Sequence, residues 1–160
     1  MKDEVLHRAV RHALSGEGAH VEVKEVFAGL DWKRAGVRPT GVAHSAFETL
    51  NHISFWQDWA VRWLDGKDPA TPQHAAGSWP GGQAPASAAV WRRAVTRLGK
   101  GLRDLETRAR KTDLLTGVGA KTRLEMLHTI GSHNSYHAGQ VVQLRQMLGS
   151  WPPPSGGLTW

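Results

Sequence analysis

The chain has 160 residues, a formal net charge of +6 and no cysteine. This length predicts one domain, residues 1–160, that is large enough to bury its own core. The lack of cysteine excludes disulfides, cysteine-based zinc sites and a thiol nucleophile supplied by the chain. No apolar run approaches the roughly 20 residues of a membrane span, and the charged N-terminus lacks a signal-peptide core. We therefore expect a soluble, cytoplasmic protein without a membrane partner.

The positive charge is spread along the chain. Its densest stretch, Arg103–Lys111, is interleaved with Asp104 and Glu106, which is typical of a solvated helix face. Because the chain lacks the clustered basic patch of a nucleic-acid-binding protein, no nucleic-acid partner is expected.

Tryptophan is unusually frequent, with eight residues against one tyrosine. Since tryptophan is seldom fully buried, several should line a pocket, a seam between elements or a subunit contact. We therefore predict a homodimer. The expected contributors are Trp63, Trp91, Trp151 and Trp160.

In chain order, helical periodicity first predicts a helix over about 2–14, which Ser15 to Gly18 end. A short helical piece follows at 19–28. Residues 31–41, with two glycines and a proline, are predicted to form a loop.

The next predicted helix runs from about Ala43 to Leu64, and Asp65-Gly66 ends it. His52, Trp56 and Trp59 lie on one face of it. Residues 67–85, rich in Pro, Gly, Ala and Ser, are predicted to form a long loop that either covers a site or merely connects two helices.

Two further helices are predicted at about 87–111 and 121–148, joined by a glycine-containing link at 113–120. The proline-rich tail from Trp151 excludes regular structure. No segment predicts a strand. Helices without a repeat period predict an all-α fold, an antiparallel four-helix bundle with long connections.

His133 and His137 are four residues apart in the last predicted helix. This spacing puts both imidazoles on one face, one turn apart, where they can bind one metal ion. His52, on the aromatic face of the helix at 43–64, is the best candidate for a third ligand. The alternative is that each is a hydrogen-bonded core residue, and the spacing alone does not decide between the two.

Two stretches resemble proteins of the DinB/YfiT-like family. They are Ala43–Gln57 (AHSAFETLNHISFWQ) and His133–Arg145 (HNSYHAGQVVQLR), and the ending Leu148–Pro154 is similar too. The resemblance implies a four-helix bundle in which His52, His133 and His137 hold a divalent metal ion. Three imidazoles leave coordination positions open for water or substrate. Zinc, nickel and iron(II) all accept such ligands.

Other residues are predicted to support this site. Each ligand needs a partner for its second ring nitrogen. The candidate partners are Glu48, Asn134 and Gln140. Trp56 and Trp59 are predicted to form the apolar wall of a pocket, and Tyr136 its polar rim. His44 is expected to be structural or to support a ligand, and His128 to face away. No partner is predicted for His7, His12, His20 or His74.

The resemblance implies two enzyme classes for a small-molecule substrate. In the first, a low-molecular-weight thiol is transferred to an electrophile, and the metal lowers the pKa of the sulfur. The chain has no cysteine, so this thiol must be a co-substrate. In the second, a hydrolase, the metal activates water. A non-catalytic, stress-related module that binds a metal or a small ligand is the third possibility, because no residue is an unmistakable general base.

Overall fold

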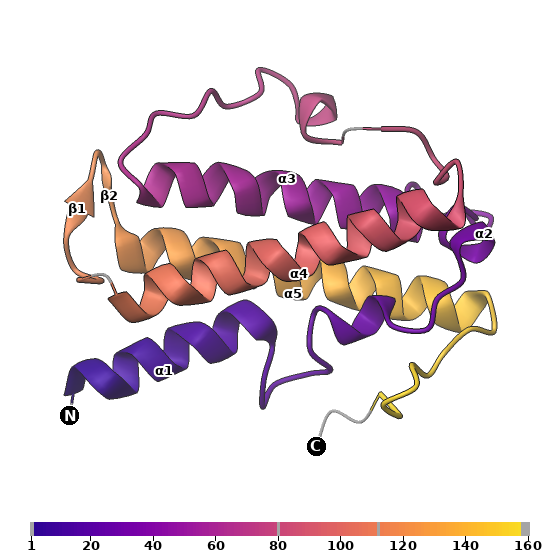
Figure 1. Ribbon diagram of the computed structural model, residues 1–160, viewed down its shortest axis with the longest axis horizontal. Coiled ribbons are helices and arrows are strands. Elements are labelled where there is room, and N and C mark those ends of the chain that lie inside the picture. Colours follow the sequence, from indigo (N-terminus) through magenta and orange to yellow (C-terminus); the bar gives the residue numbers. More distant parts are fainter. Residues whose placement is uncertain (1, 80, 112, 158–160) are drawn as a thin grey trace.

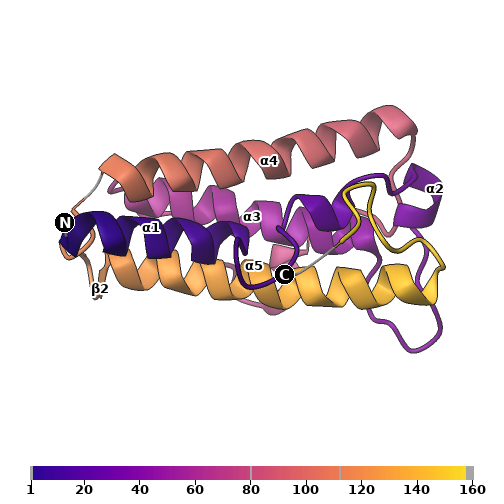
Figure 2. The same cartoon turned by 90° about the horizontal axis from the view of Figure 1, so that it is seen from below.

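The computed structural model describes residues 2–79, 81–111 and 113–157 and is mostly helical, which confirms the all-α prediction. Four long helices lie side by side (Figures 1 and 2): α1 (Lys2–Ser15), α3 (Ala46–Leu64), α4 (Ala88–Lys111) and α5 (Arg123–Met147). Helix α5 packs on α1 and α3, and α4 packs on the same two helices. The interface between α3 and α5 is the one that carries the candidate site.

The consecutive helices α3 and α4 run in the same direction (Figure 1). The connection between them, described at 65–79 and 81–87, returns along α3 before α4 begins, and it contains the 3-10 turn η2 (Ala75–Ser78). The long connection agrees with the prediction. The arrangement is not the fully antiparallel one that was predicted, because the neighbours α3 and α4 are parallel. Helix α5 runs opposite to α3 and packs against it.

Three short elements differ from the prediction. The helical piece expected at 19–28 is only the 3-10 turn η1 (Glu25–Phe27), because Val21 and Val23 are both buried and residues two apart cannot share one helix face. The loop expected at 31–41 contains the one-turn helix α2 (Trp32–Ala35). The link after α4 forms a hairpin of strands β1 (Gly117–Val118) and β2 (Lys121–Thr122). Elements this short leave no periodic pattern in the sequence.

Helix α3 begins at Ala46, three residues later than predicted, because Ser45 caps it. The Ser45 hydroxyl accepts the backbone N–H of Glu48 at 3.2 Å, and the Glu48 carboxylate accepts that of Ser45 at 2.8 Å. Thr122 and Glu125 form the same capping box at the start of α5. The end of α3 is as predicted, with Gly66 in the left-handed region at φ 75°.

The buried apolar side chains form two clusters along the helices. One cluster lies towards the start of α3 and contains Phe27, Leu50, Trp91 and Val141. The other lies towards the end of α3 and contains Leu14, Leu64, Leu105 and Leu127. None of the described helices is both long and apolar enough to cross a membrane.

Every tryptophan in the described residues is buried or half-buried. Trp91, predicted to lie at a subunit contact, is instead 6% exposed in the core, and its Nε1–H donates to the carbonyl of Leu30 at 2.8 Å. Trp63 and Trp151 are half-buried, and Trp160 lies outside the described residues. The chain therefore uses its tryptophans largely inside its own fold, and the homodimer stays a prediction.

Candidate metal centre

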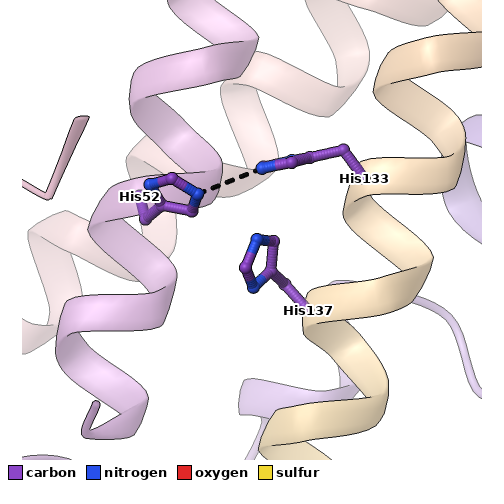
Figure 3. Close-up of side chains that lie close together, drawn as sticks. All are labelled: His52, His133 and His137. Carbon is purple, nitrogen blue, oxygen red and sulfur yellow. Dashed lines mark hydrogen bonds between the residues drawn. The ribbon is translucent and has the colours of Figure 1, made fainter. Parts of the chain in front are cut away.

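Three histidines point toward one another across the interface of α3 and α5 (Figure 3). One ring nitrogen from each of His52, His133 and His137 lies within 4.8 Å of the other two. The Nε2 atoms of His52 and His133 are 3.1 Å apart. The ring centroid of His137 is 4.7 Å from that of His52 and 4.4 Å from that of His133. The structure thus brings together the three residues that the sequence singled out.

The backbone that carries these histidines is regular helix on both sides. His133 and His137 share one face of α5 because they are four residues apart, and His52 lies in the middle of α3. Side chains on packed helices are held more closely in place than those on loops. The cluster is therefore a fixed feature of the scaffold.

Hydrogen bonds determine which nitrogen of two of these rings carries the proton. The Nδ1–H of His52 donates to the carbonyl of Ser78 at 2.8 Å, and the Nδ1–H of His137 donates to Oε1 of Gln140 at 2.7 Å. Both oxygens can only accept, so the Nε2 atoms keep their lone pairs. An outer partner of this kind accompanies most metal-binding histidines.

All three rings are neutral at pH 7. Burial, together with the neighbouring His137 and His52, lowers the pKa of His133 to about 3. Burial likewise lowers the pKa of His137 to about 4, against the opposing hydrogen bond to Gln140. The pKa of His52 is also lowered, mainly by burial. Neutral imidazole is the form that binds a metal ion.

These residues fit a divalent ion. At zinc–nitrogen distances of about 2.0–2.1 Å, two nitrogens on a tetrahedral zinc ion are about 3.4 Å apart. The 3.1 Å between the Nε2 atoms of His52 and His133 is close to this, and the three donor nitrogens all lie within 4.8 Å of one another. The buried Nδ1 of His133 has no hydrogen-bond partner in the described part of the chain, so this histidine lacks the outer partner that Ser78 and Gln140 give to the other two.

Aromatic side chains surround the three rings. The indole of Trp79 lies between His52 and His44, with centroid distances of 3.9 and 3.6 Å and nearly parallel planes. Trp56 lies edge-on at 6.5 Å from both His52 and His133. Tyr136 is 65% exposed and lies beside His137, with centroids 5.0 Å apart. The sequence pointed to Trp56 and Tyr136 but missed Trp79, whose only signal was its place in the long loop.

Two of the predicted supporting residues have other partners. Glu48 pairs with Arg38 and caps α3. The Nδ1–H of His52, which Glu48 was expected to orient, donates to the carbonyl of Ser78 instead. The Nδ2 group of Asn134 donates to the carbonyl of Leu14 at 3.3 Å, which ties α5 to α1. Of the three candidates, only Gln140 contacts a cluster histidine through a hydrogen bond.

Residues farther from the cluster also differ from the prediction. Trp59 packs against Trp56, with centroids 5.8 Å apart, and its Nε1–H donates to the carbonyl of Pro69. His20, for which no partner was predicted, accepts the hydroxyl proton of Ser135 at Nε2, 2.8 Å away. His7 also has a partner, the carbonyl of Ala109. His128 is exposed, as expected.

The fold and the site together define a mostly helical chain with three clustered histidines between two of its helices. The sequence profile of the DinB superfamily matches residues 17–141, a stretch that includes all three histidines. The chain therefore belongs to the DinB superfamily. No curated protein and no solved structure gives a significant match.

Proposed function

We propose that the four long helices form a four-helix bundle whose three histidines hold a divalent metal ion, and that the protein transfers a low-molecular-weight thiol to an electrophile. The observation that carries this proposal is the donor set. It consists of three neutral imidazoles, and no carboxylate belongs to the cluster in the described residues. A divalent ion bound there keeps its full charge and lowers the pKa of a bound thiol or water.

The surroundings of the cluster favour a thiol over water as the nucleophile. Hydrolysis at a histidine-bound metal commonly uses a glutamate as general base. Glu48, the acidic residue one turn before His52, is already bound to Arg38 and Ser45. A thiolate is a strong nucleophile and needs no further base once its proton has left.

In the proposed reaction the thiol sulfur forms a bond to an electrophilic carbon, and the bond from that carbon to its leaving group breaks. The thiol proton leaves with the displaced group, so that no oxidant or reductant is required. His52, His133 and His137 hold the ion, while Trp56 and Trp79 keep water from the sulfur. Ser78 and Gln140 keep two of the imidazoles in the required tautomer.

The test combines metal analysis with a transfer assay. Protein loaded in turn with zinc, nickel and iron(II) is incubated with a panel of low-molecular-weight thiols and a chromogenic aryl chloride. We expect thiol transfer by the wild type with at least one metal, and loss of both bound metal and transfer in His137→Ala. His128→Ala, which removes an exposed histidine from the same helix, should behave like the wild type.

Other outcomes support other functions. Ester or amide cleavage without thiol supports a metal-dependent hydrolase. Stoichiometric metal binding with neither reaction supports a non-catalytic binding module. Equal background rates for the wild type and His137→Ala with every thiol contradict the transferase proposal.

A further inference from the structure

The solvent-facing side of α5 is almost without charge. Between Glu125 and Arg145 the sequence contains no Asp, Glu, Lys or Arg, and Arg145 itself is buried. Exposed residues at alternating spacings of three and four form one stripe along this side of the helix, and they are Thr129, Ser132, Tyr136, Gly139, Gln143 and Gln146. A solvent-exposed helix face normally carries charged residues. Their depletion, together with an exposed tyrosine, is typical of the centre of a protein–protein interface.

The net charge of the protein lies on the opposite side. Basic residues occur throughout the sequence, but helix α4 alone contains eight of them and two acidic residues, a net charge of +6 that equals the net charge of the whole chain. Helices α4 and α5 lie on opposite sides of α1 and α3 (Figure 2). An acidic partner would therefore be attracted to α4, whereas a second copy of this basic chain meets the least repulsion along α5.

The stripe on α5 is complementary to itself. A two-fold axis between Tyr136 and Gly139 would set two antiparallel copies of the stripe against each other, and every contact would then occur twice. In that register each larger side chain faces a smaller one of the second copy, namely Tyr136 against Gly139, Gln143 against Ser132 and Gln146 against Thr129. A Cβ on Gly139 meets no atom within 4 Å, so one chain by itself leaves the place for the tyrosine ring open.

We propose that two copies of the chain associate through this stripe, with their α5 helices antiparallel. This interface is not the tryptophan-based one that the composition suggested, because Trp91 is in the core and none of the stripe residues is a tryptophan. It borders the histidine cluster, since the ring of Tyr136 lies 5.0 Å from that of His137. The second copy therefore covers the exposed tyrosine beside each candidate metal centre.

The first test measures the mass of the full-length protein by sedimentation equilibrium over a series of concentrations. We expect the wild type to reach twice the 17.5 kDa of one chain. Gly139→Arg fills the open position and brings two like charges close to the axis, so this variant should keep the mass of one chain. Thr96→Arg is the matched control, because it adds the same charge to an exposed position of α4 and should leave the dimer intact. Circular dichroism checks that both variants keep their helices.

The second test measures the register of the two helices by cross-linking. The chain has no cysteine, so introduced cysteines are the only ones that can pair. The double variant Ser132→Cys with Gln143→Cys should form a covalent dimer on mild oxidation, because the two positions face each other across the axis. Either single variant should not, since each position lies roughly 16 Å from its counterpart along the helix axes, too far for a disulfide. The same separation prevents a disulfide within one chain.

Three results would overturn the proposal. The first is a wild type that keeps the mass of one chain at every concentration. The second is a Gly139→Arg variant that dimerises as fully as Thr96→Arg, which would place the contact on another face. The third is a double-cysteine variant that dimerises but forms no covalent dimer, which would exclude the antiparallel register. None of these measurements involves a metal ion or a thiol substrate, so their outcome is independent of the proposed function.

Discussion

The indole of Trp79 stacks on the imidazole of His52, with ring centroids 3.9 Å apart and ring planes inclined by 6°. The preceding residue, Ser78, accepts the Nδ1–H of the same imidazole. Two consecutive residues of the long connection between α3 and α4 therefore hold His52, one on its face and one at its edge. The orientation of this candidate ligand depends on a segment that contributes no ligand itself.

We expect Trp79→Leu to weaken zinc binding by about 10- to 100-fold, the usual effect of removing a group that orients a ligand. Competition against a chromogenic chelator measures this affinity. Trp63→Leu is the control, since Trp63 packs against the apolar cluster towards the other end of α3. Equal zinc affinities of the two variants would show that the stack on His52 does not matter for the site.

The metal-free protein should lose stability as the pH falls from about 7 to about 5. In the folded chain the pKa of His133 is about 3 and that of His137 about 4, against an ordinary 6.5. Below pH 6.5 the unfolded chain therefore binds protons that the folded chain does not, and the free energy of unfolding decreases. Urea unfolding at several pH values, with a chelator present, measures the effect.

A double variant, His133→Gln with His137→Gln, should show a shallower dependence on pH in the same experiment, because it lacks both titrating groups. If its dependence were as steep as that of the wild type, the buried cluster would not be the cause.

Arg145 should be essential for stability although it lies outside the candidate site. It is 2% exposed, and its guanidinium donates to the carbonyls of Val26, Ala28 and Ser150. Arg145→Met should lower the free energy of unfolding by about 2–4 kcal/mol, since each buried carbonyl left without a donor costs about 1–3 kcal/mol. Arg92→Met, on the exposed face of α4, should change it by less than about 0.5 kcal/mol. Urea midpoints that agree for the two variants would contradict this role.

Two helical glycines should respond in opposite ways to alanine. A Cβ on Gly101 of α4 would overlap the carboxamide of the buried Gln57 and lie 3.2 Å from its Cβ, whereas a Cβ on Gly139 of α5 meets no atom within 4 Å. Gly101→Ala should destabilise the protein by about 1–3 kcal/mol through overpacking. Gly139→Ala should stabilise it by about 0.5–1 kcal/mol, because glycine loses more backbone entropy on folding. Thermal unfolding of both variants checks the signs, and a stabilised Gly101→Ala would refute the close contact between α3 and α4.

Much of the candidate site could be predicted from local spacing. His133 and His137 share a helix face whenever residues 121–148 are helical, and the aromatic stripe beside His52 points that residue into the fold. The wrong expectations concern partners at a distance. Glu48 is one turn from His52, but its carboxylate is bound to Arg38 and to the cap of α3. The cap has a sequence pattern, Ser45 followed three residues later by Glu48, whereas the contact with Arg38 has none.

The sequence by itself determined the long helices and the candidate ligands, because periodic burial and ligand spacing are properties of neighbouring residues. It did not determine that α3 and α4 run in the same direction, or that Ser78 and Trp79 hold His52. Those features depend on where the connection at 65–87 lies on the assembled helices. An irregular segment has no periodic sequence pattern from which its course could be predicted. Its course is decided by its packing against the assembled helices.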